Sequence, residues 1–388
     1  MHRKLLPFIA AVAILAGCRK SDSPAPTTQP EGCTVSSGAS NGTVIEGTYI
    51  IAYNPSTGAR ATSAKSMADL GTNILEKHSI GKSAIQAGFT SGLGGGIIAK
   101  LTSDEALILE SDPDISAVEP DRIIALGSCF TVVAPTLITW NVKKVGYGDG
   151  TGKTAWILDT GIDFDHPDLN VDVNRSKSFV TGVTSADDEN GHGTHVAGII
   201  GAKNNNIGVL GVASGANLVA LKVLGKDGEG KLSYIIQALS YVSNNGKADD
   251  VVNMSLGEDV TSDILDQSVK STAARGILIS IAAGNDSKPA ANFSPGRANG
   301  QNIFTVSAVD SLDRFASFSN YGNDAVDYAA PGVRILSTYM NGQYARMSGT
   351  SMAAPHVAGL LLLNGGNMHS SGTALNDPDG TPDPIASK

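Results

Sequence analysis

The sequence predicts an α/β fold for residues 140–388, with a parallel sheet sandwiched between helices. Strands buried on both faces are expected to be almost continuously apolar. Five such runs occur, at residues 154–161, 217–225, 249–257, 276–285 and 302–310. Amphipathic stretches at residues 231–246 and 262–276 lie between them and are predicted helices. This alternation favours a parallel sheet covered on both faces, with its functional side chains outside the carboxyl ends of the strands.

A smaller α+β domain is predicted over residues 43–126. Apolar runs at 47–55, 94–102 and 115–126 are predicted strands. Residues 62–79 and 103–112 are predicted helices, the second with Ser103 or Asp104 as its cap. The order β-α-β-α-β predicts a small ferredoxin-like sandwich.

The first residues are typical of an export signal. A short basic start precedes an apolar stretch from Leu5 to Ala16, which is too short to span a bilayer. Cys18 then follows Leu-Ala-Gly, which resembles the bacterial lipobox. That resemblance implies removal of residues 1–17 as a lipoprotein signal peptide and anchoring of the exported protein to a membrane of the cell envelope through lipidated Cys18. An ordinary signal peptide with an incidental cysteine is the alternative.

Composition, net charge and cysteine content restrict the possible linker, partners and disulfides of the chain. Residues 18–42 are rich in Ser, Pro and Thr and are predicted to form a flexible tether. The net charge is −9, which argues against nucleic acid as a partner because phosphate recognition needs a basic surface. After export, Cys33 and Cys129 can form one disulfide, or they remain two free thiols.

Three short motifs each place a reactive residue type in a suitable local setting. Asp159 ends an apolar run in ILDTGID, His192 opens HGTHVAG, and Ser351 lies in GTSMAAPH. These motifs, in the order Asp, His, Ser, resemble those of the subtilisin-like serine peptidases from about residue 140 to residue 363. The resemblance implies a serine endopeptidase that hydrolyses peptide bonds of protein substrates through a Ser-His-Asp triad and an acyl-enzyme.

The residues suit these roles chemically. The hydroxyl of Ser351 needs an adjacent base to act as a nucleophile, and the imidazole of His192 can serve as that base and later as an acid. Asp159 would orient His192. A second histidine, His195, could suggest a metal site, but no third ligand with suitable spacing appears, so we expect it to be a packed helix residue.

The resemblance also implies an oxyanion donor and a peptide-binding cleft. Asn285 follows an apolar strand and would donate its amide to the oxyanion; an ordinary turn Asn is the alternative. A bound peptide would add a strand between two backbone edges. The substrate-binding residues expected there are Ser255, Leu256 and Gly257 on one edge, Gly228 and Gly230 on the other, and Gly284 beside the scissile position.

A structural calcium site is a further expectation, although the chemistry requires no cofactor. The loop KNNNIGVLG at residues 203–211 resembles a calcium-binding loop of subtilisins, with Asp168 supplying a carboxylate and Asn205 a side-chain amide. Carbonyls of Lys203, Ile207 and Val209 would complete an oxygen shell of the kind Ca²⁺ accepts. A Gly-Asn surface turn is the alternative.

The resemblance finally implies that residues 43–126 are an inhibitory propeptide, the protein's own intramolecular partner, in an autoprocessed zymogen. Val118-Glu119-Pro120-Asp121 would lead into a processing junction at 127–139, with self-cleavage between about Asp121 and Pro135. A small accessory binding domain is the alternative. We expect a monomer. Two other functions stay open: a catalytically silent lipoprotein that binds peptides, and an esterase or transacylase.

Overall fold

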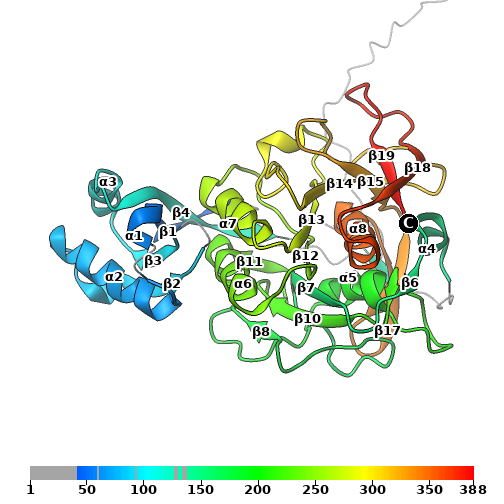
Figure 1. Ribbon diagram of the computed structural model, residues 1–388, viewed down its shortest axis with the longest axis horizontal. Helices are drawn as coiled ribbons and strands as arrows, with labels where there is room; N and C mark the ends of the chain where they lie inside the picture. Colours follow the sequence, from blue (N-terminus) through cyan, green and yellow to red (C-terminus); the bar gives the residue numbers. More distant parts are fainter. Residues whose placement is uncertain (1–41, 59–60, 92–93, 126–129, 133–137) are drawn as a thin grey trace, which may run out of the picture. The chain divides into compact units, whose positions relative to one another are not determined.

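A nine-stranded sheet organises the larger part of the computed structural model, which describes residues 42–388 apart from 59–60, 92–93, 126–129 and 133–137 (Figure 1). The strand order is β18-β19-β15-β14-β13-β12-β7-β10-β8. All pairs are parallel except β18 with β19. The five central strands are β10 (Asn217–Lys222), β7 (Thr154–Asp159), β12 (Val251–Met254), β13 (Leu278–Ala282) and β14 (Ile303–Val309).

Helices cover both faces of this sheet, as the alternation of apolar runs and amphipathic stretches predicts. Ala155 and Ile157 of β7 belong to the apolar cluster that contains α5 (His192–Gly201) and α8 (Thr350–Asn364). Trp156 and Leu158 belong to the cluster of α6 (Leu232–Asn245) and α7 (Asp263–Ala273). Successive side chains of a strand point to opposite faces, so Asp159, next in this alternation, faces α5 and α8.

The carboxyl ends of the central strands form the functional edge. The chain runs from β7 to β10 on one side, and then to β12 on the other side of β7. Such a reversal leaves a crevice outside the strand ends. Asp159 ends β7, residues 255–257 follow β12, and Asn285 follows β13.

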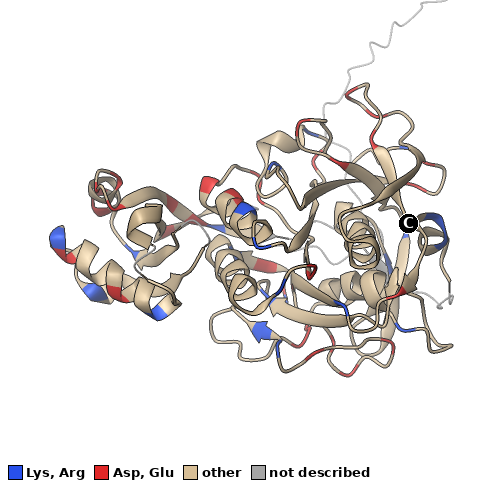
Figure 2. Ribbon diagram, viewed as in Figure 1, with Lys and Arg blue, Asp and Glu red and all other residues tan. Residues whose placement is uncertain are grey.

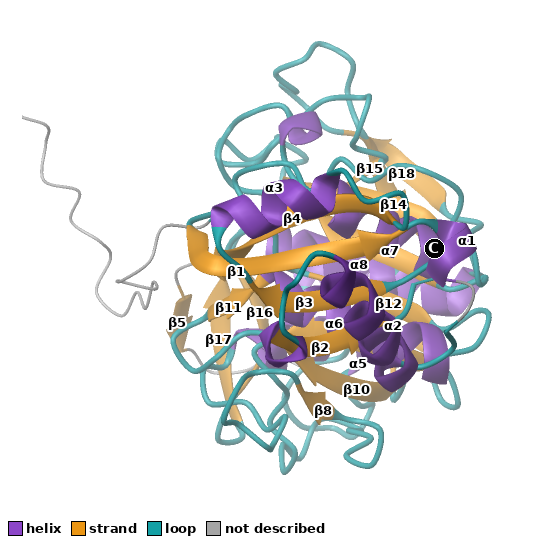
Figure 3. Ribbon diagram, turned by 90° about the vertical axis from the view of Figure 1, so that its left-hand side faces the viewer, coloured by secondary structure: helices purple, strands orange, loops and turns teal. Residues whose placement is uncertain are grey.

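The preceding residues supply four strands of a second sheet, whose fifth strand is β11 (Glu229–Lys231) of the larger domain, and their own helices lie on one side of it (Figure 3). Its strands are β1 (Val44–Tyr53), β2 (Ile85–Phe89), β3 (Gly96–Lys100) and β4 (Ile115–Ala125). Helices α2 (Ala64–Lys77) and α3 (Ser103–Glu110) pack on it around a separate apolar core. The order β-α-β-β-α-β is that of a ferredoxin-like fold. The sequence prediction omits β2, because Ile85–Phe89 contains Gln and Gly and gives a weak strand signal.

The predicted cap of α3 is also wrong. Thr102, rather than Ser103 or Asp104, is the N-cap. Its hydroxyl accepts a hydrogen bond from the Glu105 N–H at 3.2 Å, and the Glu105 carboxylate accepts one from the Thr102 N–H at 2.7 Å. This capping box satisfies two orphan N–H groups at once, which neither Ser103 nor Asp104 does here.

The remaining elements are short or lie at the edges. They comprise α1 (Pro55–Gly58), η1 (Lys82–Ala84), β5 (Phe130–Val132), α4 (Trp140–Val145), β6 (Gly148–Asp149), β8 (Lys177–Ser178), β9 (Ala213–Ser214), β11 (Glu229–Lys231), η2 (Ala290–Asn292), β15 (Tyr328–Pro331), β16 (Ile335–Tyr339), β17 (Gln343–Met347), β18 (His369–Thr373) and β19 (Pro384–Ser387). No helix within the described ranges is long and apolar enough to cross a bilayer. Figure 2 shows acidic and basic residues interspersed over the coloured ribbon, with no continuous basic stripe on it.

Candidate active site

Asp159 is a fully buried carboxylate at the end of β7. Its Oδ1 accepts hydrogen bonds from the Thr160 N–H at 2.7 Å and from His192 Nδ1 at 2.8 Å. A buried carboxylate needs such donors to remain ionised without a large cost. The contact fixes the imidazole so that Nδ1 carries the proton and Nε2 is the basic nitrogen.

His192 is the first residue of α5 and is 1% exposed. The helix start is held by Asp188, whose carboxylate accepts hydrogen bonds from the N–H groups of Gly191 and Thr194, both at 3.0 Å. Gly191 has a φ of 104°, and a Cβ there would lie 2.0 Å from the ring of Tyr339, so the position requires glycine. Within the described residues, His192 Nε2 has no hydrogen-bond partner. An unpartnered basic nitrogen is what a general base needs.

Ser351 lies in the first turn of α8, which packs against α5. Its side-chain hydroxyl donates to the Ser255 carbonyl at 3.2 Å. Among the described residues it therefore makes no hydrogen bond to His192. The structure thus joins Asp159 to His192 and leaves the predicted Ser351–His192 contact unmade. Catalytic hydrogen bonds often form only with substrate bound, and rotation about one side-chain bond redirects the hydroxyl.

Asn285 is oriented by the N-terminus of α8. Its Oδ1 accepts the Thr350 N–H at 2.8 Å and the Thr350 hydroxyl at 3.0 Å. Because a backbone N–H is a donor, the amide must present its oxygen to Thr350, which leaves Nδ2 on the other side. Gly284 precedes it with a φ of 106°, and a Cβ there would lie 2.3 Å from Asn320. This glycine turn aims the amide toward the start of α8.

One predicted cleft edge pairs with a strand of the smaller domain. β4 runs antiparallel to β11, with Ile124 opposite Gly230 and Ile123 opposite Lys231. Gly228 has a φ of 76°, and a Cβ at Gly230 would come within 2.1 Å of the Val223 carbonyl. The edge therefore presents backbone to its partner strand. Leu256, on the other predicted edge, is buried in the same apolar cluster as Ile124.

Two carboxylates of β4 cap helices of the larger domain. Glu119 accepts hydrogen bonds from the Ser262 hydroxyl and from the Ile264 N–H, the latter at 3.0 Å. Asp121 accepts the Ser233 N–H at 2.9 Å and its hydroxyl at 2.6 Å. Burial raises the pKa of both carboxyls, and the hydrogen bonds from the two helix N-termini oppose that shift, so β4 docks through these caps as well as through its backbone.

The Val-Glu-Pro-Asp string marks this segment in the sequence but does not by itself predict these contacts. The sequence does carry a signal for them, because Glu119 and Asp121 are two positions apart on a strand and therefore share one face.

Asp168 and Asn205, the predicted calcium ligands, lie close together. Asp168 Oδ2 accepts the Val209 N–H at 3.0 Å, while its buried Oδ1 has no partner among the described residues. Burial raises the pKa of Asp168 to about 6. Asn205 Oδ1 accepts the Ile207 N–H at 3.2 Å. An orphaned carboxylate oxygen beside the side-chain amide of Asn205 fits a hard cation, which takes oxygen ligands. No group of three His, Cys, Asp or Glu side chains suited to a metal occurs in the described ranges, so carbonyls would have to supply much of the shell.

His195 packs as predicted. It is fully buried, and its Nε2 lies 3.0 Å from the Ile335 carbonyl and 3.1 Å from the Ala345 carbonyl. Burial lowers the pKa of His195 to about 3, which keeps the ring neutral.

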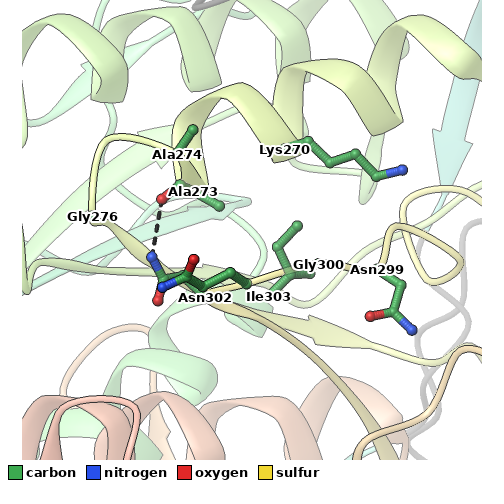
Figure 4. A pocket seen from close by; sticks show the side chains of 9 residues that line it. Lys270, Ala273, Ala274, Gly276, Asn299, Gly300, Asn302 and Ile303 are labelled. Atoms are coloured by element: carbon green, nitrogen blue, oxygen red, sulfur yellow. Dashed lines mark hydrogen bonds between the residues drawn. The ribbon is translucent and has the colours of Figure 1, made fainter.

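A cavity of about 470 Å³ lies away from these residues, at the end of α7 (Figure 4). Lys270, Gly276 and Asn302 line it, and none of the predicted site residues does. Cys18, Cys33 and Cys129 lie outside the described residues, as does most of the predicted junction at 127–139.

Comparisons with known proteins identify the family and several relatives of this chain. The model of the Subtilase family matches residues 150–366. M-protease of Shouchella clausii (strain KSM-K16) is 42% identical over 271 residues, which cover 68% of this chain and 67% of that protein. Subtilisin BL of Lederbergia lenta is 48% identical over 214 residues, which cover 55% and 76%. A crystal structure of a cold adapted subtilisin-like serine proteinase superposes with a TM-score of 0.57 at 35% identity, covering 64% of this chain and 98% of that one.

Proposed function

The chain belongs to the subtilase family and is a subtilisin-like serine endopeptidase; from that premise we propose that it is exported, lipid-anchored and made as an autoprocessed zymogen. The observation that carries the catalytic assignment is the buried 2.8 Å contact between His192 Nδ1 and Asp159, with Nε2 left unpartnered. This arrangement supports His192 as the base that activates Ser351.

The proposed reaction begins when Ser351 Oγ attacks the carbonyl carbon of the scissile peptide bond and His192 Nε2 takes the hydroxyl proton. The negative charge on the carbonyl oxygen is held by Asn285 Nδ2 and the Ser351 N–H. His192 then gives its proton to the departing amine, and an acyl-enzyme remains. Water repeats the sequence and releases the carboxylic acid product, with Asp159 stabilising the imidazolium in both halves.

A serine-directed fluorophosphonate tests this assignment. The wild-type enzyme should be labelled once, and Ser351→Ala should not be labelled at all. Failure of the wild type to react would favour the silent, peptide-binding alternative. Labelling that persists in Ser351→Ala would place the nucleophile elsewhere.

We infer that residues 43–126 inhibit the enzyme. Two features support this: the antiparallel pairing of β4 with the predicted substrate edge, and the capping of α6 and α7 by Asp121 and Glu119. The precursor of Ser351→Ala should then stay uncut near residues 121–135, whereas the wild type cuts itself. Normal maturation of purified Ser351→Ala would assign the cleavage to another peptidase.

Lipid anchoring rests on the sequence around Cys18. Metabolic labelling with an alkyne fatty acid should mark the wild type and leave Cys18→Ser unmarked, and the variant should leave the membrane fraction. Equal labelling of the wild type and Cys18→Ser would show that the start of the chain is an ordinary signal peptide.

We also propose that Asp168 and Asn205, with neighbouring carbonyls, hold a structural calcium ion. The unpartnered Asp168 Oδ1 and the raised pKa of this carboxyl support the proposal. A bound cation would give that oxygen a partner and would stabilise the charged form of the carboxylate.

A further inference from the structure

Lys222, the last residue of β10, is fully buried. It is the one lysine or arginine in the buried class among the residues that the structure describes. An ammonium group loses its hydration on burial, which is costly unless the protein supplies strong interactions in return. The contacts of the Lys222 ammonium group therefore indicate which role offsets the cost of its burial.

The sheet register places Lys222 directly beside Asp159. The two residues are Cα partners in the parallel pairing of β10 with β7. Ala220 and Ile157, two positions earlier in each strand, both contribute to the apolar cluster of α5 and α8. By the alternation of strand side chains, Lys222 and Asp159 point to this same face.

The ammonium group is bound mainly by the residue that follows Asp159. Lys222 Nζ donates to the Thr160 carbonyl at 2.5 Å. Its nearest carboxylate partner, Glu189 Oε2, is 3.9 Å away, and the Glu189 side chain is 57% exposed. The positive charge is thus only partly compensated and stays available to the groups around Thr160.

Thr160 connects Lys222 to both halves of the catalytic pair. Its N–H donates to Asp159 Oδ1 at 2.7 Å. Its hydroxyl donates to Asp188, which caps α5, at 2.9 Å, and accepts the N–H of Gly193, the residue after His192, at 2.9 Å. A shift of Thr160 would therefore move the carboxylate and the imidazole relative to each other.

We propose that Lys222 is a positioning residue for the Asp159–His192 pair, because its ammonium group holds Thr160, which bonds to Asp159 and to Gly193. The proposal rests on the proposed catalytic roles. It predicts that loss of the ammonium donor lowers turnover and leaves substrate binding unchanged.

The test compares Lys222→Met with Lys222→Gln in the full-length chain. Values of kcat and KM for a peptide substrate are measured, and kcat is normalised to active sites titrated with fluorophosphonate. Met removes the donor and should lower kcat about tenfold. Gln keeps a donor for Thr160, so its loss of kcat should be smaller. KM should stay unchanged in both variants, because Lys222 belongs to neither of the predicted substrate-binding edges.

Leu221→Ala is the matched control. Leu221 is fully buried, lies next to Lys222 in β10 and faces the opposite cluster, so its truncation destabilises the same strand without touching Thr160. Its kcat per titrated site and its KM should equal those of the wild type.

Three results would overturn the proposal. The first is a kcat per titrated site in Lys222→Met that equals that of the wild type. The second is the same loss of kcat in Leu221→Ala. The third is failure of both Lys222 variants to fold while Leu221→Ala folds, which would assign Lys222 to folding alone. Failure of wild-type labelling would instead remove the proposed catalytic assignment itself.

Discussion

The catalytic edge and the surface beneath β4 both bury carboxylates, but they satisfy them differently. Asp159 and Asp188 accept hydrogen bonds from groups of their own domain. Beneath β4, Glu258 is 1% exposed, and neither of its carboxylate oxygens has a partner within the described residues. Asp159 also has one oxygen, Oδ2, without a partner among the described residues, but its Oδ1 accepts two hydrogen bonds, which offset part of the cost of burying the carboxylate. An inhibitory domain that is released after cleavage, as proposed for residues 43–126, can tolerate a group that opposes docking.

The largest effect, on turnover, should come from substituting Asp159 at the catalytic edge. Asp159→Asn keeps the shape of the side chain but can stabilise the wrong tautomer of His192, and should lower kcat about 10⁴-fold. Asp165→Asn, on the exposed loop that follows, should leave turnover unchanged. Steady-state hydrolysis of a peptide substrate measures both. A loss below tenfold in Asp159→Asn would show that this carboxylate does not orient the base.

The next effect concerns the charged caps of β4. In an uncleaved Ser351→Ala precursor, Asp121→Asn or Glu119→Gln should weaken docking by roughly 1–3 kcal/mol, the range for losing a charged hydrogen bond. Hydrogen exchange of the Ser233 and Ile264 amides, which donate to these carboxylates, should speed up about tenfold or more. Asp104→Asn, in the exposed first turn of α3, is the control and should leave both amides protected. Unaltered exchange in all variants would contradict the docking role.

Glu258 should make docking depend on pH. Burial raises the pKa of Glu258 to about 8; Arg122 acts against this shift, while Glu119, Asp266 and Asp121 add to it. The folded, docked state therefore holds this proton more tightly than the unfolded chain. The corresponding stability is present below the ordinary carboxyl pKa and is lost as pH rises toward 8, by at most about 1.4 kcal/mol per pH unit.

Thermal unfolding of the Ser351→Ala precursor between pH 5 and pH 9 measures this loss. Adding Glu258→Gln should flatten the decline, whereas adding Asp263→Asn, an exposed neighbour whose side chain is 75% exposed, should preserve it. Parallel curves for the precursor with and without Glu258→Gln would mean that this proton does not govern docking.

The smallest effect, on the melting temperature, should come from removing calcium from the proposed site at Asp168. Excess chelator should lower the melting temperature of the wild type by about 5 °C, the change expected for losing a ligand present at roughly a hundred times its Kd. Asp168→Asn should melt at the same temperature with and without chelator. An unfolding curve of the wild type that chelator does not move would remove the calcium proposal.

Much of the architecture follows from the sequence because its signals are local. Continuous apolar runs identify the central strands, and small residues after them mark the turns at Asp159 and Asn285. The weak strand β2 and the cap at Thr102 were missed because a polar five-residue strand and a one-residue shift lie below what pattern alone resolves.

The burial of Glu258 and Lys222 was not predicted from the sequence, for a physical reason. Glu258 lies in a polar loop, where an exposed carboxylate is the normal expectation. Lys222 interrupts an apolar run, but only the register with β7 reveals its neighbour. Such positions depend on tertiary contacts between segments that are far apart in the chain.

The pairing of β4 with β11 has a kinetic consequence. Backbone groups of Ile123 and Ile124 occupy an edge whose hydrogen bonds any extended chain can make. If residues 43–126 are the inhibitory propeptide proposed above, they compete with substrate for this edge. Substrate should then speed the release of the propeptide, and each released enzyme molecule can cleave propeptides that still inhibit others. Activity should therefore rise abruptly after a delay.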